Sequence, residues 1–144
     1  MEEISVKQAA ELGITTQHGK MDNGESRYRL VAKDGSSYLR IEAALLGGWQ
    51  NSHYHKSLAE TYILQEGWAA YAESRGSDLR MWIMRPGDLL TASPGVPHNV
   101  YLSGQAVVHV VKHGGDGEPA DWCADPALDE LTRHLSEADI LRWL

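Results

Sequence analysis

Between Tyr28 and Lys112 the chain is built from short runs in which apolar and polar residues alternate. A period of two places every second side chain on the same face of a β-strand, so that one face is buried and the other meets water. The clearest run has Arg40 and Glu42 on one face and, on the other, Leu39, Ile41, Ala43 and Leu45. The pattern predicts an all-β fold.

Glycine-containing turns separate these runs. Asp34-Gly35 and Arg75-Gly76 each stand between two runs, where glycine supplies the positive φ that a tight hairpin needs. Roughly eight or nine segments of strand length fit between Ile14 and Lys112. A closed barrel or a double-sheet jelly roll leaves fewer exposed strand edges than an open sheet, so one of these two architectures is expected.

Both ends of the chain have helix signals. Ser5 can cap a short helix that runs to Leu12 and ends at Gly13, Asp125-Pro126 is typical of an N-cap and first helical residue, and Ser136 with Asp139 is typical of a capping box. The apolar residues of the C-terminal segment are expected to pack on the barrel or on a second subunit: Leu128, Leu131, Leu135, Ile140, Leu141 and Leu144.

The 144 residues are interpreted as one domain, with a barrel core of about 14–112 and a C-terminal helical segment of about 125–144. A formal net charge of −7 argues against binding to nucleic acid or to anionic lipid, which both require clustered lysine and arginine. No apolar run approaches the length of a membrane span. One cysteine and a start without the basic and apolar regions of a signal peptide predict a cytoplasmic protein.

Two windows carry candidate ligands for a metal. In the first, His53 and His55 stand two residues apart, a spacing that sends both imidazoles to one face of a strand, and Glu60 follows after a short turn. The second ends in His98, directly after a rigid Pro-Gly-Val-Pro turn over 94–97. Three neutral imidazoles and one carboxylate suit a single divalent transition metal such as Zn, Fe, Mn, Ni or Co, rather than copper(I) or calcium.

The two windows resemble the two signature motifs of the cupin superfamily, and the chain resembles a small single-domain cupin. The first motif is complete and the second partial, because Ser93 and Leu102 stand where proline and asparagine are common. The matching residues are Gly47, His53, His55, Glu60 and Gly67 in the first motif, and Gly87, Gly95 and His98 in the second. The resemblance implies a jelly-roll β-barrel with short terminal helices, a metal at its centre and a homodimer, but no single reaction.

Alternation along the strands predicts three residues of a substrate pocket. Trp49 and Asn51 share the strand face of His53, and Tyr62 shares that of Glu60. Met84 is a further candidate, although aromatic and apolar residues also simply fill barrel interiors.

The favoured function is a metal-dependent enzyme that acts on a small carbohydrate- or hydroxy-acid-like molecule by isomerisation, epimerisation or decarboxylation. The metal would be a Lewis acid, and Glu60 or a bound water would move the proton. Two alternatives stay open: an iron(II)-dependent dioxygenase, and a protein that binds a small molecule without changing it.

Overall fold

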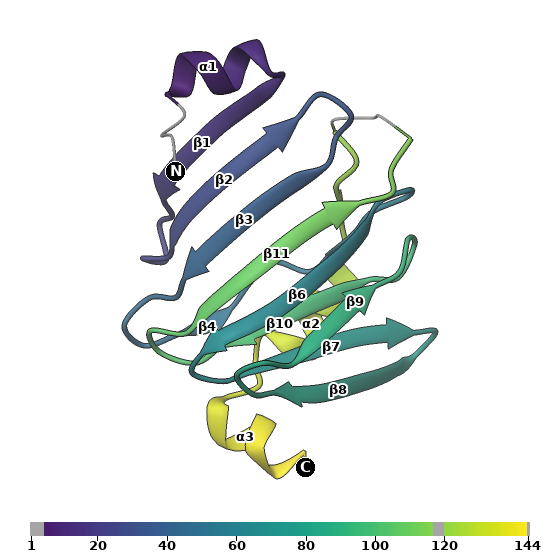
Figure 1. The fold of residues 1–144 in the computed structure, drawn as a ribbon. Coiled ribbons are helices and arrows are strands. Elements are labelled where there is room, and N and C mark those ends of the chain that lie inside the picture. Colours follow the sequence, from purple (N-terminus) through teal and green to yellow (C-terminus); the bar gives the residue numbers. More distant parts are fainter. Residues whose placement is uncertain (1–4, 117–119, 144) are drawn as a thin grey trace.

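The computed structural model describes residues 5–116 and 120–143 and is built mainly from antiparallel strands (Figure 1). The strands of the first sheet, in spatial order, are β1 (Ile14–Lys20), β2 (Ser26–Ala32), β3 (Ser37–Glu42), β11 (Val107–His113), β6 (Ala59–Glu66) and β9 (Leu89–Ala92). Those of the second are β12 (Cys123–Ala124), β5 (His53–Tyr54), β10 (His98–Leu102), β7 (Ala69–Arg75) and β8 (Asp78–Met84), with β4 (Gly48–Trp49) also paired to β10.

This two-sheet arrangement confirms the predicted all-β jelly roll. Between Ile14 and His113 the structure has nine strands of four residues or more and two strands of two residues, slightly more than the eight or nine expected. β1 and β2 lie at one end of the molecule, far from β7 and β8 at the other (Figure 1).

A tightly packed apolar core lies between the sheets, from Ile41 and Leu64 on one side to Tyr71 and Val100 on the other. The predicted run that begins at Leu39 contributes less than expected. Leu39 and Ile41 are buried, but β3 ends at Glu42, and Leu45 is 74% exposed in the turn that follows, so its assignment to the buried face is wrong. After β3 the chain turns: the N–H of Gly47 donates to the carbonyl of Ala44 at 3.0 Å, and Gly47 and Gly48 both have positive φ.

The expected hairpins and helix caps are confirmed. Gly35 joins β2 to β3 and Gly76 joins β7 to β8, each with positive φ. Ser5, Asp125 and Ser136 cap three short helices: α1 (Val6–Glu11), α2 (Pro126–Thr132) and α3 (Glu137–Arg142).

The C-terminal helices are fixed by few side chains. Leu128 and Ile140 are fully buried, whereas Leu131 and Leu141 are exposed, so only part of the predicted apolar face packs on the sheets; Leu144 lies outside the described residues. None of the three helices in the described part of the chain is long and apolar enough to cross a membrane.

The turn before the candidate ligands depends on a close approach between two backbone segments. Gly47 has φ +69°, and a Cβ at this residue would lie 2.2 Å from the carbonyl oxygen of Leu102 on β10. A flexible side chain could move away from such a contact, but the backbone of β10 cannot, so only glycine fits at residue 47.

Replacing Gly47 by alanine is therefore expected to lower the free energy of unfolding by about 3 kcal/mol or more, from left-handed strain together with a steric clash. Gly76→Ala is the matched control, because Gly76 has φ +68° and a Cβ at that residue would meet no atom within 4 Å. It should cost only about 1 to 2 kcal/mol. Urea denaturation of both variants measures the difference, and equal losses would contradict the role assigned to the close approach.

Candidate metal centre

The four predicted ligands come from both sheets and meet between them. His53 begins β5, His55 follows it, and His98 begins β10, where it pairs directly with His53 across the antiparallel ladder. Glu60 is the second residue of β6, in the other sheet. All four side chains are buried, with exposed fractions of 8% for His53, 1% for His55, 4% for Glu60 and 1% for His98.

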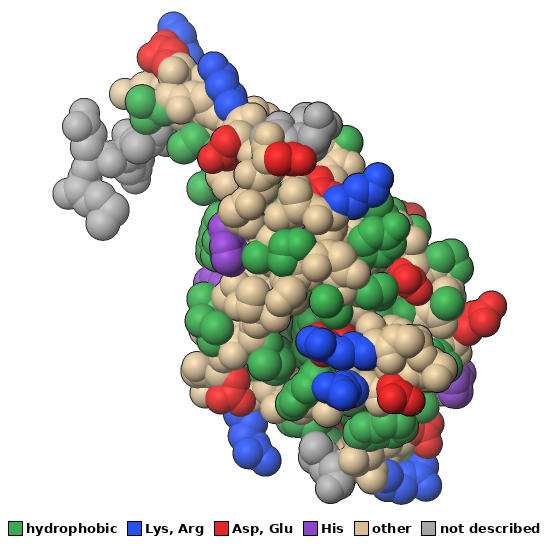
Figure 2. All heavy atoms as spheres, turned by 90° about the vertical axis from the view of Figure 1, so that its right-hand side faces the viewer, with side chains coloured by type: hydrophobic (Ala, Val, Ile, Leu, Met, Phe, Trp, Pro, Cys, Tyr) green, Lys and Arg blue, Asp and Glu red, His purple; other side chains and the backbone are tan. Residues whose placement is uncertain are grey.

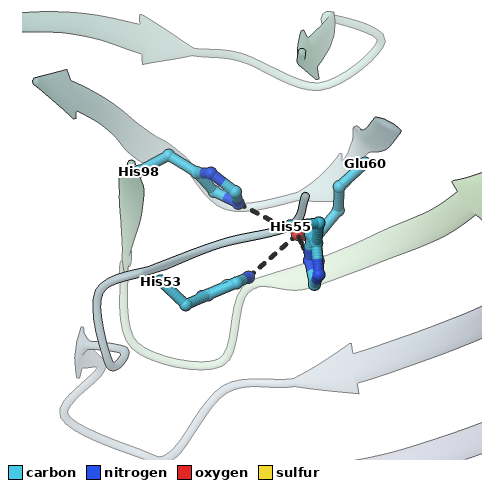
Figure 3. Close-up of side chains that lie close together, drawn as sticks. All are labelled: His53, His55, Glu60 and His98. Carbon is cyan, nitrogen blue, oxygen red and sulfur yellow. Dashed lines mark hydrogen bonds and ion pairs between the residues drawn. The ribbon is translucent and has the colours of Figure 1, made fainter. Parts of the chain in front are cut away.

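The side chains converge on one point (Figure 3). Glu60 Oε2 lies 2.9 Å from Nε2 of His53, 2.7 Å from Nε2 of His55 and 2.9 Å from Nε2 of His98. One ligand atom from each of the four residues falls within 4.8 Å of the others. The predicted set is thus brought together as a group that could hold a metal ion.

The Nδ1 nitrogen of each of the three imidazoles bonds to a backbone carbonyl oxygen. Nδ1 of His53 lies 3.1 Å from the carbonyl oxygen of Asn51, and Nδ1 of His98 lies 2.9 Å from that of Val96. Nδ1 of His55 meets the carbonyl oxygen of Asp121. A backbone carbonyl can only accept, so each Nδ1 carries a proton and Nε2 is the ring nitrogen that faces inward and could bind a metal.

Three lone pairs and a carboxylate oxygen aimed at one buried point repel one another unless a positive charge lies among them. Protonating all three rings would supply it, but that would put three imidazolium ions in a buried site. One divalent cation balances the same group with less charge to desolvate. The donor set therefore fits a metal ion, and its mixture of imidazole nitrogen and carboxylate oxygen suits Zn, Fe, Mn, Co or Ni.

Glu60 is held in its ionised form. Burial alone would raise the pKa of its carboxyl, but without a metal the hydrogen bonds that Nε2 of His53, His55 and His98 donate to it outweigh burial and keep the pKa well below its usual range. The carboxylate is thus available as an anionic ligand at neutral pH.

Asp121 fixes the loop that carries His55. Its carboxylate accepts hydrogen bonds from the backbone N–H groups of Lys56, Ser57 and Leu58, at 2.6, 2.9 and 3.0 Å. Burial would raise the pKa of this carboxyl, but those backbone donors lower it well below its usual range. The side chain of Asp121 thus holds the loop after His55, and its backbone carbonyl holds the imidazole of His55.

A cavity of about 380 Å³ opens beside the four residues, and His53 and Glu60 are part of its lining. Two of the predicted pocket residues, Asn51 and Tyr62, line it. Trp49 and Met84 do not: Met84 is buried in the main core, and Trp49 packs against Tyr101 while its Nε1 donates to the carbonyl of Leu135 at 3.0 Å. Parity fails for Trp49 because β4 ends there and the chain is not extended again until His53.

Sequence reasoning missed four residues with cationic or aromatic side chains that line the cavity: Arg27, Arg29, Lys112 and Trp122. Strand alternation could have identified Lys112, because it lies on the same face of β11 as the buried Val108 and Val110. Trp122 stacks on the ring of His53, with centroids 5.6 Å apart, but it lies far from His53 in the sequence and no local pattern indicates the contact.

Comparison with known proteins gives matches in structure alone. Neither a protein-family model nor a curated protein sequence matches the chain. Oxalate decarboxylase from Bacillus subtilis superposes with a TM-score of 0.63 and 17% identity, over 89% of this chain and 34% of the other. A double-stranded β-helix protein from Klebsiella pneumoniae superposes with a TM-score of 0.58 and 21% identity, over 74% of this chain and 83% of that one.

The chain has the cupin fold. A third structure with this fold, hydroxypropylphosphonic acid epoxidase from S. wedmorenis, matches with a TM-score of 0.55 and 15% identity, over 68% of this chain and 55% of that chain. The oxalate decarboxylase contains Mn(II) centres. This chain spans only 30% to 34% of the length of the oxalate decarboxylase chains that it matches.

Removing one imidazole should abolish metal binding. Purified protein is expected to hold about one transition-metal ion per chain, and His98→Ala should hold almost none after dialysis, because the remaining three ligands cannot complete the shell. His109→Ala is the control, since His109 bonds to Tyr38 and Gln65 away from the four ligands. Elemental analysis measures the metal, and equal content in both variants would exclude this site.

The lowered pKa of Asp121 predicts a pH-dependent contribution to stability. A carboxyl with a depressed folded-state pKa stabilises the fold above its unfolded pKa of about 3.9, and this contribution disappears as the pH falls through the folded value. The difference in unfolding free energy between wild type and Asp121→Asn should therefore be largest above about pH 5 and shrink below about pH 4.

Urea denaturation in the presence of a chelator measures this difference without a contribution from metal loss. Asp22→Asn is the matched control, because Asp22 is exposed and accepts none of the backbone hydrogen bonds recorded for Asp121. A difference for Asp121→Asn that stays constant from pH 7 to pH 2 would contradict the role of its charge.

Proposed function

We propose that this cupin is a metal-dependent enzyme that acts on a small polar molecule by isomerisation, epimerisation or decarboxylation. The observation that carries the proposal is the inward convergence of three Nε2 atoms and the Glu60 carboxylate beside a cavity of about 380 Å³. That volume lies in the range of small-molecule sites.

The roles of the residues follow from their positions. His53, His55, Glu60 and His98 would hold the metal, which would supply a Lewis acid to a carbonyl or carboxylate oxygen of the substrate. Glu60 is the one carboxylate among the described residues that line the cavity, so it is proposed to move the proton. Asn51 and Tyr62 are proposed to orient the substrate. Burial raises the pKa of Tyr62, and its phenol therefore stays protonated as a donor.

The comparisons support this class of reaction without deciding it. The fold is shared with oxalate decarboxylase, whose name states a decarboxylation, and with an epoxidase, whose name states an oxidation. An oxygen-dependent reaction and binding without turnover are therefore the alternatives against which the proposal is tested.

Two further features of the protein are proposed from the sequence: a homodimer, and a location in the cytoplasm with neither nucleic acid nor membrane as partner. On the face drawn in Figure 2, lysine and arginine side chains lie beside aspartate and glutamate, without an extended field of positive charge. Such a mixed surface agrees with the absence of a polyanionic partner.

The proposed reaction class predicts turnover without oxygen. Metal-loaded protein is incubated anaerobically in D₂O with a panel of small hydroxy acids, keto acids and sugars, and the products are followed by NMR. Isomerisation or epimerisation should introduce deuterium at the carbon next to the carbonyl, and decarboxylation should release CO₂. His53→Ala should abolish both signals, whereas the control His109→Ala should keep them.

Turnover that requires air would replace the proposal with an oxygenase. A panel compound that binds, shown by a change in its NMR line width, but is recovered unchanged after long incubation would replace it with a binding protein.

A further inference from the structure

The cavity has a cationic wall opposite its metal centre. Arg27 and Arg29 pair directly with Ile41 and Leu39 of β3, and Lys112 pairs directly with Glu60 of β6. Residues paired in this way share one face of a sheet, so all three side chains point inward with the buried Leu39 and Ile41. The pattern of β2 is thus inverted: its arginines face the cavity, while Tyr28 and Leu30 are 43% and 39% exposed.

Two of these cations lack a partner within the described part of the chain. Arg27 forms an ion pair with the buried Glu25, at 2.9 Å. For Arg29 and Lys112, by contrast, the described residues provide no side-chain hydrogen bond and no ion pair within 4.0 Å. Both are partly buried, and desolvation lowers the pKa of each, which is the signature of a charge held without full compensation.

The nearby carboxylates are already engaged. Glu60 is the acidic group that favours the charged forms of both Arg29 and Lys112, but its Oε2 faces three imidazoles. Asp121 acts more weakly on Lys112, and its oxygens accept from three backbone N–H groups. A divalent metal bound beside Glu60 would leave the cavity with a clear excess of positive charge.

A further donor lines the same cavity. Nε2 of Gln50 is buried and has no hydrogen-bond partner among the described residues. A buried amide donor without an acceptor costs about 1 to 3 kcal/mol, so a ligand oxygen that accepted from it would recover that loss.

We propose that the cavity selects a small organic acid, with one carboxylate held by Arg29 and Lys112 and a second oxygen directed at the metal centre. The inference rests on the proposed function, because it names the substrate class of that site. The sequence left carbohydrate-like and hydroxy-acid-like substrates open, and the inference favours the acids. A neutral sugar would leave two partly buried cations unpaired, whereas a carboxylate supplies charge-assisted hydrogen bonds to both.

The test measures binding rather than catalysis. Malonate is titrated into the metal-loaded protein by calorimetry and compared with malonamide, which has a similar shape but no charge, and with inorganic phosphate. The variants are Arg29→Met and Lys112→Met. The control is Arg40→Met, which removes one cation from the opposite face of the same sheet, where Arg40 pairs with Glu42. Elemental analysis and thermal unfolding confirm that each variant keeps its metal and its fold.

Malonate should bind more tightly than malonamide, and each cavity variant should weaken malonate binding by about 10- to 100-fold with little effect on malonamide. Arg40→Met should change neither by more than about twofold. Equal affinities for the acid and the amide, or unchanged malonate binding in both cavity variants, would overturn the proposal. So would tighter binding of phosphate than of malonate.

The two proposals can fail separately. Charge-dependent malonate binding without turnover of any acid would uphold the anion site and remove the proposed catalysis. Turnover of a neutral sugar that is unaffected by Arg29→Met would uphold catalysis and remove the anion site.

Discussion

Three hydrogen bonds from imidazole Nδ1–H groups to backbone carbonyls orient the rings of the candidate metal centre. Because the carbonyls of Asn51, Val96 and Asp121 can only accept, they hold a proton on each Nδ1 and turn three Nε2 atoms toward Glu60. Two of these carbonyls lie two residues before the histidine that they orient, and the third comes from a distant loop. The backbone course of each ligand loop is therefore as important to the metal centre as the ligands themselves.

The fold provides those backbone positions through contacts between loops that are far apart in the sequence. Gly95, in the turn before His98, donates its N–H to the carbonyl of His55 at 2.6 Å, which ties the second ligand window to the first. Asp121 joins the segment before β12 to the loop after His55. The segments that carry His55 and His98 are thus tied to each other and to the segment before β12, beside the packed apolar core.

The fold and the four metal-centre residues could be predicted from the sequence because both have local signals: alternation, glycine turns, and imidazoles at strand spacing. The cavity wall could not be predicted in the same way. Strand parity places Trp49 there only by extension through a segment where the chain leaves strand geometry, and Trp122 reaches His53 only through tertiary packing. Parity along β2 is real, but its apolar residues face outward, and hydrophobicity alone assigns the arginines to the wrong face.

That inversion in β2 is itself informative about function. Placing Tyr28 and Leu30 in water and two arginines inside costs stability, since exposed apolar area loses its burial energy and partly buried charge loses hydration. A strand selected for stability alone would have the opposite pattern. Ion pairing with Glu25 offsets the cost for Arg27, whereas Arg29 has no ion pair or side-chain hydrogen bond among the described residues and is favoured only by the longer-range attraction of Glu60. An anion that entered the cavity, as proposed above, would supply charge-assisted hydrogen bonds to Arg29 and so offset this cost.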